Sequence, residues 1–475
     1  MPDNCAQNDV LRLTNLKLEG AVDVPQDDGS VIAELTMSYV GPIPDTCPNC
    51  GQKFYKHSSR DIRVLDTPFL GKRTELLISY PRRRCLNCKT LWKGSCPDID
   101  EKRSLTKRAF ADVTNRALNM TFEQVCNDYN FSANTAKNIF VDYMAENEQK
   151  LRFKTPCFLG IDEIKIKRLG EVTVVTDLEH RTLFDMFQGR NQQRLLEYFE
   201  ALPGTENVMW VCSDMYRPFQ NTLAATMPNA TWVIDHFHVV AKANEALDAL
   251  RRELQSGMKS KKERIKTKKG LAYTLKTRRR DLTSEEAEKI RLLRNHPKLG
   301  PLAVAYDLKE DFFCIYDDNL SSKDNAQRAF AEWEQSIPAD SMFDKFREVA
   351  VMVHNHYDAI FAKWDCPTAI SNGYTECVNR LIRENNLKGR GYSFEVLRGR
   401  TLYRKTNLTA LTENGLVYGP EIQESMPNFF FESIQEDDDD DTEEDDTFDE
   451  GYVDKDTGEI LDPGVEDEGD EPIMF

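Results

Sequence analysis

Two Cys-x-x-Cys pairs constrain the fold of this chain more than any other feature of its sequence. They are Cys47-Pro-Asn-Cys50 and Cys85-Leu-Asn-Cys88, and the first is followed by Gly51. Pairs of this spacing form knuckles, and two knuckles supply the four thiolates of a closed tetrahedral Zn²⁺ site. Two unrelated pairs or a redox dithiol would also give four cysteines, but the matched knuckles favour zinc. The sequence therefore predicts a zinc ribbon, with strand-like segments at 61–65 and 74–80 between the pairs.

The remaining eight cysteines are isolated, so reduced thiols and one metal site explain the cysteine usage better than a disulfide framework. The first ten residues lack the basic and apolar regions of a signal peptide, and no apolar stretch approaches the length of a membrane span. We therefore expect a cytoplasmic protein without membrane association.

The net charge of −18 is concentrated at one end of the chain. Residues 432–475 hold 22 acidic residues and one basic residue, which leaves 61 basic and 58 acidic residues elsewhere. The body thus carries a small positive charge, which does not exclude a polyanionic partner. The tail itself is of low complexity, and we expect it to be disordered.

Residues 31–39 are predicted to form a strand before the first knuckle. Residues 103–144 read as helices, the first of them an amphipathic segment at 105–117. Segments 121–128 and 133–144 flank a short turn, with Ser132 as the expected N-cap of the second. This layout is typical of a helix-turn-helix, in which Asn134 and Lys137 would face DNA, although an ordinary helical hairpin would look similar.

From residue 156 the pattern changes to short β-rich runs. Strands are predicted at 157–161, 172–177 and 182–188, then a helix at 192–202, a strand at 208–212, a helix at 218–227 and a strand at 231–234. This order predicts a mixed sheet flanked by helices. Beyond residue 236 the chain turns helical and basic, with helices expected near 299–313, 326–336, 343–361 and 373–385, the last capped by Asn372.

Acidic residues close several of the apolar runs. Asp162 follows the first strand, Asp214 follows the fourth, and Glu376 lies on a late helix. Two carboxylates held at neighbouring strand ends repel each other, and this repulsion favours binding of Mg²⁺ between them. A third carboxylate would complete a site for two ions. Strand-end acids also commonly cap loops, and rivals exist within the same sheet: Glu163, Asp177, Asp185, and Asp235 with His238.

At these residues the chain resembles bacterial insertion-sequence transposases of the ISL3 type, which carry an N-terminal zinc ribbon. The matching pieces run from about residue 40 to 405. They include Gly160-Ile-Asp-Glu163, Ser213-Asp-Met-Tyr216, Asp235-His-Phe-His238, Ala305-Tyr-Asp-Leu-Lys-Glu310, and Ser371-Asn-Gly373 with Glu376 and Asn379. One departure is Cys377, where glycine is usual after the glutamate.

The resemblance implies an α/β fold: a ribonuclease-H-like mixed sheet with an all-helical insertion, preceded by a small zinc ribbon and a helix-turn-helix-like module. It implies that Asp162, Asp214 and Glu376 hold catalytic Mg²⁺ or Mn²⁺ and that Asp235 and His238 support them. The implied DNA contacts, together with those suggested by charge and by the helix-turn-helix layout, are Arg82, Arg83, Arg84, Asn134, Lys137, Lys165, Lys167, Arg251, Arg252 and the lysine clusters at 259–269.

The expected organisation is an N-terminal extension (1–40), the ribbon (41–98), the helical DNA-binding module (99–150), the first part of the catalytic core (151–238), the helical insertion (239–368), the second part of the core (369–428) and the acidic tail (429–475). The implied function is that of a transposase that binds terminal inverted repeats and catalyses metal-dependent cleavage and strand transfer of double-stranded DNA as a homo-oligomer. Two alternatives stay open: a catalytically silent DNA-binding regulator, and a nuclease of the same fold without strand transfer.

Overall fold

A computed structural model describes residues 11–27, 29–129, 131–150, 153–258, 271–317, 322–404 and 407, together with 452–453 and 460–461. The chain forms two units, Met1–Glu424 and Ser425–Phe475. In the second unit the described residues are the antiparallel pair β13 (Tyr452–Val453) and β14 (Ile460–Leu461). The rest of the acidic tail, like the lysine clusters at 259–269, lies outside the described residues. Over the described part of the chain, no helix combines the length and apolarity that crossing a bilayer requires.

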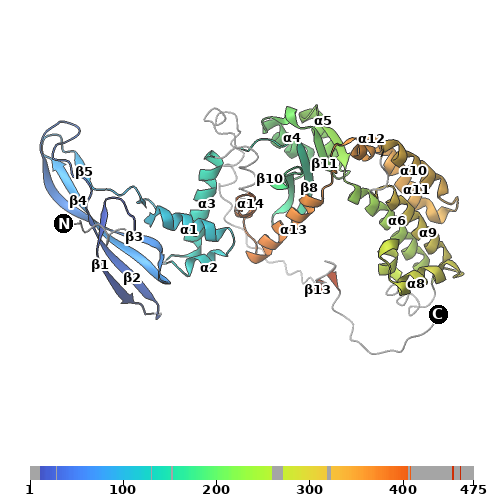
Figure 1. Ribbon diagram of the computed structural model, residues 1–475, viewed down its shortest axis with the longest axis horizontal. Coiled ribbons are helices and arrows are strands. Elements are labelled where there is room, and N and C mark those ends of the chain that lie inside the picture. Colours follow the sequence, from blue (N-terminus) through green and yellow to red (C-terminus); the bar gives the residue numbers. More distant parts are fainter. Residues whose placement is uncertain are drawn as a thin grey trace, which may run out of the picture. The chain divides into compact units, whose positions relative to one another are not determined.

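The N-terminal part is a seven-stranded sheet, drawn in blue in Figure 1. Its strands are β1 (Leu16–Pro25), β2 (Val31–Tyr39), β3 (Phe54–Phe69), β4 (Lys72–Cys85), β5 (Leu91–Lys93), β6 (Ile99–Asp100) and β7 (Leu105–Thr106). The predicted strand at 31–39 is confirmed, and those at 61–65 and 74–80 lie within longer strands. The expected boundary between the N-terminal extension and the ribbon was residue 40. Because β2 pairs in parallel with β4, this boundary falls within one continuous sheet.

Three helices follow: α1 (Lys107–Ala117), α2 (Phe122–Cys126) and α3 (Ala133–Lys150). The helix predicted from residue 105 begins two residues later, because Leu105 and Thr106 pair as β7. Thr121 and Gln124 form a capping box at the start of α2. The Ser132 hydroxyl accepts a hydrogen bond from the Thr135 amide at 3.2 Å, which confirms Ser132 as the cap of α3.

A second sheet holds five strands in the order β10-β9-β8-β11-β12. These are β8 (Phe158–Ile166), β9 (Gly170–Asp177), β10 (Thr182–Gln188), β11 (Trp210–Ser213) and β12 (Thr231–Ile234). The first three pair antiparallel, whereas β11 pairs in parallel with both β8 and β12. The predicted mixed sheet and its alternation of strands and helices are thus confirmed.

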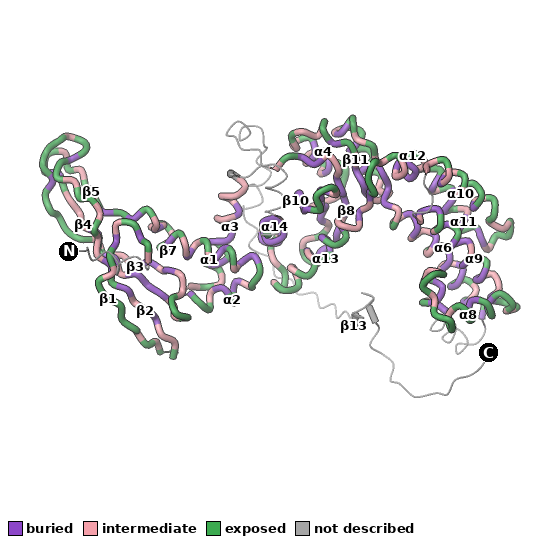
Figure 2. The backbone as a smooth tube through the Cα atoms, in the orientation of Figure 1, coloured by how far each residue is buried: buried purple, intermediate pink, exposed green. Residues whose placement is uncertain are grey.

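Helices cover both faces of this sheet, and the residues of β8 alternate between them. Leu159 and Ile161 pack with residues of α4 (Gln192–Ala201) and α5 (Arg217–Thr226). Ile164 and Ile166 instead belong to the apolar cluster that includes residues of α1–α3, α13 (Gly373–Lys388) and α14 (Phe394–Leu402). Gly160 and Asp162 share this second face, because side chains two residues apart on a strand point the same way. Figure 2 shows the buried strands of this sheet in purple.

Between β12 and α13 the described residues are helical and contain no strand. The α-helices include α6 (His236–Ser256), α8 (Ser284–Arg294), α9 (Gly300–Cys314), α10 (Lys323–Ser336), α11 (Asp344–Asn355) and α12 (Tyr357–Phe361). They enclose their own apolar core. The single helix predicted at 343–361 is wrong, because the backbone leaves the helical region at His356, with φ of −126°, between α11 and α12.

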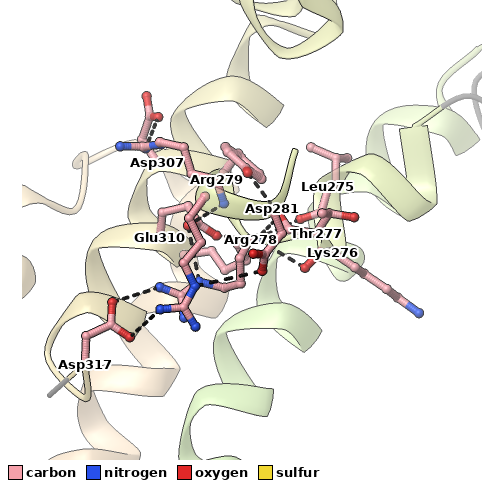
Figure 3. Close-up of polar contacts among 12 residues, drawn as sticks. Leu275, Lys276, Thr277, Arg278, Arg279, Asp281, Asp307, Glu310 and Asp317 are labelled. Carbon is pink, nitrogen blue, oxygen red and sulfur yellow. Dashed lines mark hydrogen bonds and ion pairs between the residues drawn. The ribbon is translucent and has the colours of Figure 1, made fainter. Parts of the chain in front are cut away.

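A buried charge network fixes the turn that precedes α8 onto α9 (Figure 3). Lys309 is fully buried, and its Nζ donates to the carbonyl oxygens of Leu275 and Thr277 at 3.0 and 3.1 Å. Its ammonium also lies 2.7 Å from a carboxylate oxygen of Glu310. Arg278 pairs with Glu310 and Asp317. A lysine without such partners would be too costly to bury, so this network is structural.

Candidate active site and metal centres

The four predicted zinc ligands meet at one end of the N-terminal sheet. The sulfur atoms of Cys47 and Cys88 are 3.5 Å apart, as are those of Cys50 and Cys85. All four sulfurs lie within 4.8 Å of one another. A tetrahedral zinc ion with bonds of ~2.3 Å requires sulfur separations of ~3.8 Å, so the cluster has the size of such a site.

The backbone of each knuckle turns as a thiolate site requires. Gly51 has φ of +70°, and its amide donates to the Cys47 carbonyl at 2.9 Å. In the second knuckle Lys89 takes the same left-handed conformation, and the Cys85 amide donates to the Thr90 carbonyl. The Thr90 hydroxyl lies 3.0 Å from the Cys88 sulfur and lowers the pKa of that thiol to about 6, which favours the thiolate that binds metal.

The predicted DNA contacts of the ribbon and the helices differ in exposure. Arg84 is exposed, whereas Arg82 and Arg83 are half-buried. Successive side chains of a strand point to opposite faces, so the three arginines of β4 do not form one cationic face. Asn134 and Lys137 are both exposed at the start of α3, where a helix-turn-helix would present them.

Asp162 is the most constrained of the predicted catalytic acids. The sequence placed it at the end of a strand, but it lies inside β8, because β9 pairs with β8 as far as Ile166. The residue is 8% exposed, and its carboxyl group accepts a hydrogen bond from Asn379 Nδ2 of α13 at 2.8 Å. Burial raises the pKa of Asp162 to about 6, and the charges of Asp214 and Glu376 add to that shift.

Asp214 directly follows β11, as predicted, and is half-buried. Its Oδ1 accepts a hydrogen bond from the Tyr216 amide at 3.0 Å, which fixes the carboxyl group at the turn into α5. Burial raises the pKa of Asp214, while His238 and Arg190 act in the opposite direction. Among the described residues, neither His238 nor Arg190 forms an ion pair with this carboxyl group.

The remaining predicted residues form a compact group. Asp235 follows β12, His238 lies in the first turn of α6, and Glu376 lies in the first turn of α13. One ligand atom from each lies within 4.8 Å of those of the other two. Partial desolvation raises the pKa of Glu376, and the charge of Asp235 adds to that shift. Among the described residues, this trio and the four cysteines are the groups that meet this distance; Asp162, Asp214 and Glu376 do not form such a trio.

Three of the rival acids in the same sheet have side-chain partners of their own, and for Glu163 and Asp185 that partner is an arginine. Glu163 pairs with Arg190, Asp177 lies 2.8 Å from the His180 ring, and Asp185 lies 2.8 Å from the Arg398 guanidinium. No such pair involves Asp162, Asp214 or Glu376 within the described ranges. An acid with a cationic partner is already compensated, so the unpaired acids are the better candidates for binding a metal ion.

Hydrogen bonds made by Asn372 and Thr375 hold the start of α13 against β8, β9 and the residue that follows β12, and sequence reasoning missed them. Asn372, predicted as a cap, makes no side-chain capping bond; its Nδ2 donates to the Ile161 carbonyl at 2.9 Å and its amide donates to Asp235 at 3.3 Å. The Thr375 hydroxyl donates to Asn372 Oδ1 at 2.7 Å and lies 2.7 Å from the Thr176 hydroxyl. These contacts set the height of Glu376 over the sheet.

The predicted basic residues of the core do not all reach the surface. Lys165 and Lys167 are exposed near the end of β8. Arg252 is exposed and pairs with Asp248. Arg251, however, is 7% exposed, and its guanidinium contacts Asp248 and Gln255 of the same helix. In this conformation the Arg251 guanidinium is therefore turned toward its own helix and is not presented at the surface.

Two protein-family models match this chain, one over the second sheet and the helices that follow it, and one over the four-cysteine ribbon. A family model described as "Transposase", of the ISL3-type DDE group, matches residues 159–401. A second, described as "zinc-finger of transposase IS204/IS1001/IS1096/IS1165", matches residues 43–88. The second match covers Cys47, Cys50, Cys85 and Cys88, and supports structural zinc at the four-cysteine cluster.

Two curated relatives are similar over long stretches. The transposase for insertion sequence element IS1557 of Mycobacterium tuberculosis is 28% identical over 288 residues, which cover 54% of this chain and 62% of the relative. The transposase for insertion sequence element IS1001 of Bordetella parapertussis is 24% identical over 390 residues, which cover 78% of this chain and 90% of the relative. The chain belongs to the ISL3-type DDE transposase family.

Proposed function

We propose that this chain is the transposase of an insertion sequence, which binds the terminal inverted repeats of its element and catalyses divalent-metal-dependent DNA cleavage and strand transfer. The observation that carries the proposal is the set of unpaired carboxylates around β8. Asp162 lies in β8 and Asp214 directly follows the adjacent strand β11, and the charge of Asp214 contributes to the raised pKa of Asp162. Glu376 approaches from α13.

Asp162, Asp214 and Glu376 would hold Mg²⁺ or Mn²⁺. The donor set fits, because all three supply oxygen ligands and none has a cationic partner within the described residues. A buried carboxylate that repels its neighbour is stabilised by a cation, which explains how the protein would tolerate Asp162 and Asp214 side by side. When bound, divalent ions lower the pKa of an attacking water or 3′-hydroxyl and stabilise the departing phosphate oxygen.

The fold supports the same reading. A five-stranded sheet in the order β10-β9-β8-β11-β12, with two parallel pairs after an antiparallel meander, is the arrangement expected of a ribonuclease-H-like core. On this proposal α6 to α12 are the helical insertion, and α13 with α14 is the second part of the core. The ribbon and the α1–α3 module, with Asn134 and Lys137 exposed, would read the inverted repeats, and two or more copies of the chain would join the two ends.

The test is a cleavage and joining assay. The substrate is a duplex taken from the DNA that flanks the gene for this chain, incubated with a target plasmid and Mg²⁺ or Mn²⁺. We expect nicking at the repeat ends and transfer to the plasmid. Asp214→Ala should abolish both while end binding persists, because only a metal ligand is lost. Glu200→Gln, at an exposed acid of α4, is the control and should keep full activity.

The other possible outcomes count against the site or indicate a different function. Cleavage that survives Asp214→Ala would overturn this site. Cleavage without joining would indicate a nuclease, and binding without cleavage would indicate a regulator. The two alternatives are therefore separated in one experiment.

A further inference from the structure

The trio Asp235, His238 and Glu376 is separate from the ribbon and adjoins the Asp162–Asp214 pair, because the charge of Glu376 acts on the Asp162 carboxyl. Asp235 ends β12 and precedes α6, and the His238 amide donates to the Asp235 carbonyl at 3.1 Å. This first helical turn brings the two side chains onto one side of α6. Glu376 completes the trio from α13, with all three ligand atoms within 4.8 Å.

Two ligand atoms of the trio lack partners in the described structure. Asp235 is 1% exposed; its Oδ1 accepts from the Asn372 amide and faces the His236 ring at 3.4 Å, whereas its Oδ2 has no hydrogen-bond partner. His238 Nε2 also has none. Leaving a buried carboxylate oxygen unpaired costs free energy that a bound cation would offset.

The donor set favours a particular class of metal ion. An imidazole nitrogen with two carboxylates suits Zn²⁺ or another transition ion, whereas Mg²⁺ prefers oxygen ligands and retains most of its water. Three protein ligands would leave the fourth tetrahedral position open.

We infer that Asp235, His238 and Glu376 form a second zinc site, distinct from the four-cysteine ribbon. Because Glu376 belongs to this site and to the proposed Mg²⁺ site, zinc bound here withdraws that carboxylate from catalysis. Zinc at this position therefore inhibits Mg²⁺-dependent cleavage. The inhibition rests on the proposed function; the zinc site itself does not.

The first experiment counts zinc in the full chain after dialysis against buffered micromolar Zn²⁺. We expect two ions per wild-type chain, and one in His238→Ala and in Asp235→Asn. His180→Ala, which removes a histidine paired with Asp177 outside the trio, is the matched control and should keep two. Cobalt substitution identifies the ion that is lost: the sulfur-to-cobalt absorption of the ribbon should persist in His238→Ala, and an unchanged urea unfolding transition of that variant shows that the rest of the chain is folded.

The second experiment titrates Zn²⁺ into the Mg²⁺-dependent cleavage assay, with each variant compared with its own zinc-free rate. His238→Ala should require at least about tenfold more zinc for half-inhibition, as expected when a ligand is removed. One zinc per wild-type chain, or two in His238→Ala, would overturn the site. Two zinc ions with the same half-inhibition in His238→Ala and wild type would overturn the sharing of Glu376. An inactive wild-type enzyme would count against the proposed function alone, because the zinc count is independent of cleavage.

Discussion

Asp162 combines burial with negative charge, and this has a consequence for stability. The folded-state pKa of about 6 lies above the ordinary value of 3.8, so the folded protein holds the proton more tightly than the unfolded chain. Stability therefore falls as pH rises from about 4 to 6, and the cost is fully present above that range.

Asp162→Asn should remove this cost. Without added divalent cations at pH 7, we expect the free energy of unfolding in urea to rise by about 1–3 kcal/mol. The difference from wild type should shrink toward pH 4, where the wild-type carboxyl is protonated. Equal stability at pH 7 would contradict the assignment of Asp162 as an uncompensated buried acid. The same variant should lack cleavage, which would separate function from stability at one residue.

Asn379 is a positioning residue for the same carboxyl. Asn379→Ala removes the 2.8 Å hydrogen bond to Asp162, and we expect the Mg²⁺ concentration for half-maximal cleavage to rise about 10- to 100-fold, as for other groups that orient metal ligands. Asn385→Ala, further along α13, is the control and should leave the Mg²⁺ dependence unchanged. A loss of rate at saturating Mg²⁺, with no change in half-saturation, would argue against this role.

The candidate residues were predictable from sequence to different degrees. The positions of Asp214 and Asp235, each directly after a strand, were predicted correctly. The end of an apolar run marks the end of a strand when no neighbouring strand continues the pairing beyond it. Asp162 was placed at an end because the run Phe158–Ile161 stops there, whereas pairing with β9 continues the strand. The local sequence pattern carries no information about the pairing of β8 with β9. Nor does it reveal that Asn372 and Asn379 bond to residues more than 200 positions away.

At the scale of elements, the contact between α13 and β8 depends on a glycine. A Cβ at Gly160 would lie 2.5 Å from the hydroxyl oxygens of Thr176 and Thr375, and 2.7 Å from Asn372 Oδ1. The close approach of helix and strand therefore requires the absence of a side chain at this position.

Gly160→Ala should push α13 away from the sheet. We expect a loss of about 1–3 kcal/mol in the free energy of unfolding, as for other overpacked sites, and a larger loss of cleavage because Glu376 moves with its helix. Gly20→Ala in β1, where no heavy atom lies within 4 Å of the added Cβ, serves as the control. Wild-type activity in Gly160→Ala would show that the register of α13 tolerates displacement.

The bounds of several elements could be predicted from the sequence because they depend on the local pattern of apolar residues. The strands at 31–39, 182–188 and 231–234 were predicted with the bounds that the structure has. The parallel pairing of β2 with β4 was not predicted, since residues before the first knuckle carry no signal of which strand they join. The break at His356 was also missed, because the apolar period continues across it while the backbone does not.

At the scale of the whole chain, charge is divided between a slightly basic body and an acidic tail. Removing residues from Glu432 onward should leave cleavage at the repeat ends intact, because the candidate site lies entirely before that point. It should also strengthen binding to unrelated duplex DNA, since the removed carboxylates repel phosphates.

Filter binding over a range of salt concentrations measures this effect, and the affinity gain should fade as salt screens the charges. A chain whose tail is replaced by an uncharged segment of equal length should behave like the truncation. A truncation that cannot cleave would contradict the assignment of the tail as dispensable.

The long separation along the chain between β8 and α13 has a consequence for how such a protein is made. Asp162 and its partner Asn379 are 217 positions apart, and the ribbon and the α1–α3 module precede both. A ribosome therefore releases the parts proposed to recognise DNA well before it releases the last carboxylate. On the proposed function, a product that terminates early would occupy element ends without cutting them, so incomplete translation would yield a competitor of the finished enzyme and never a stray nuclease.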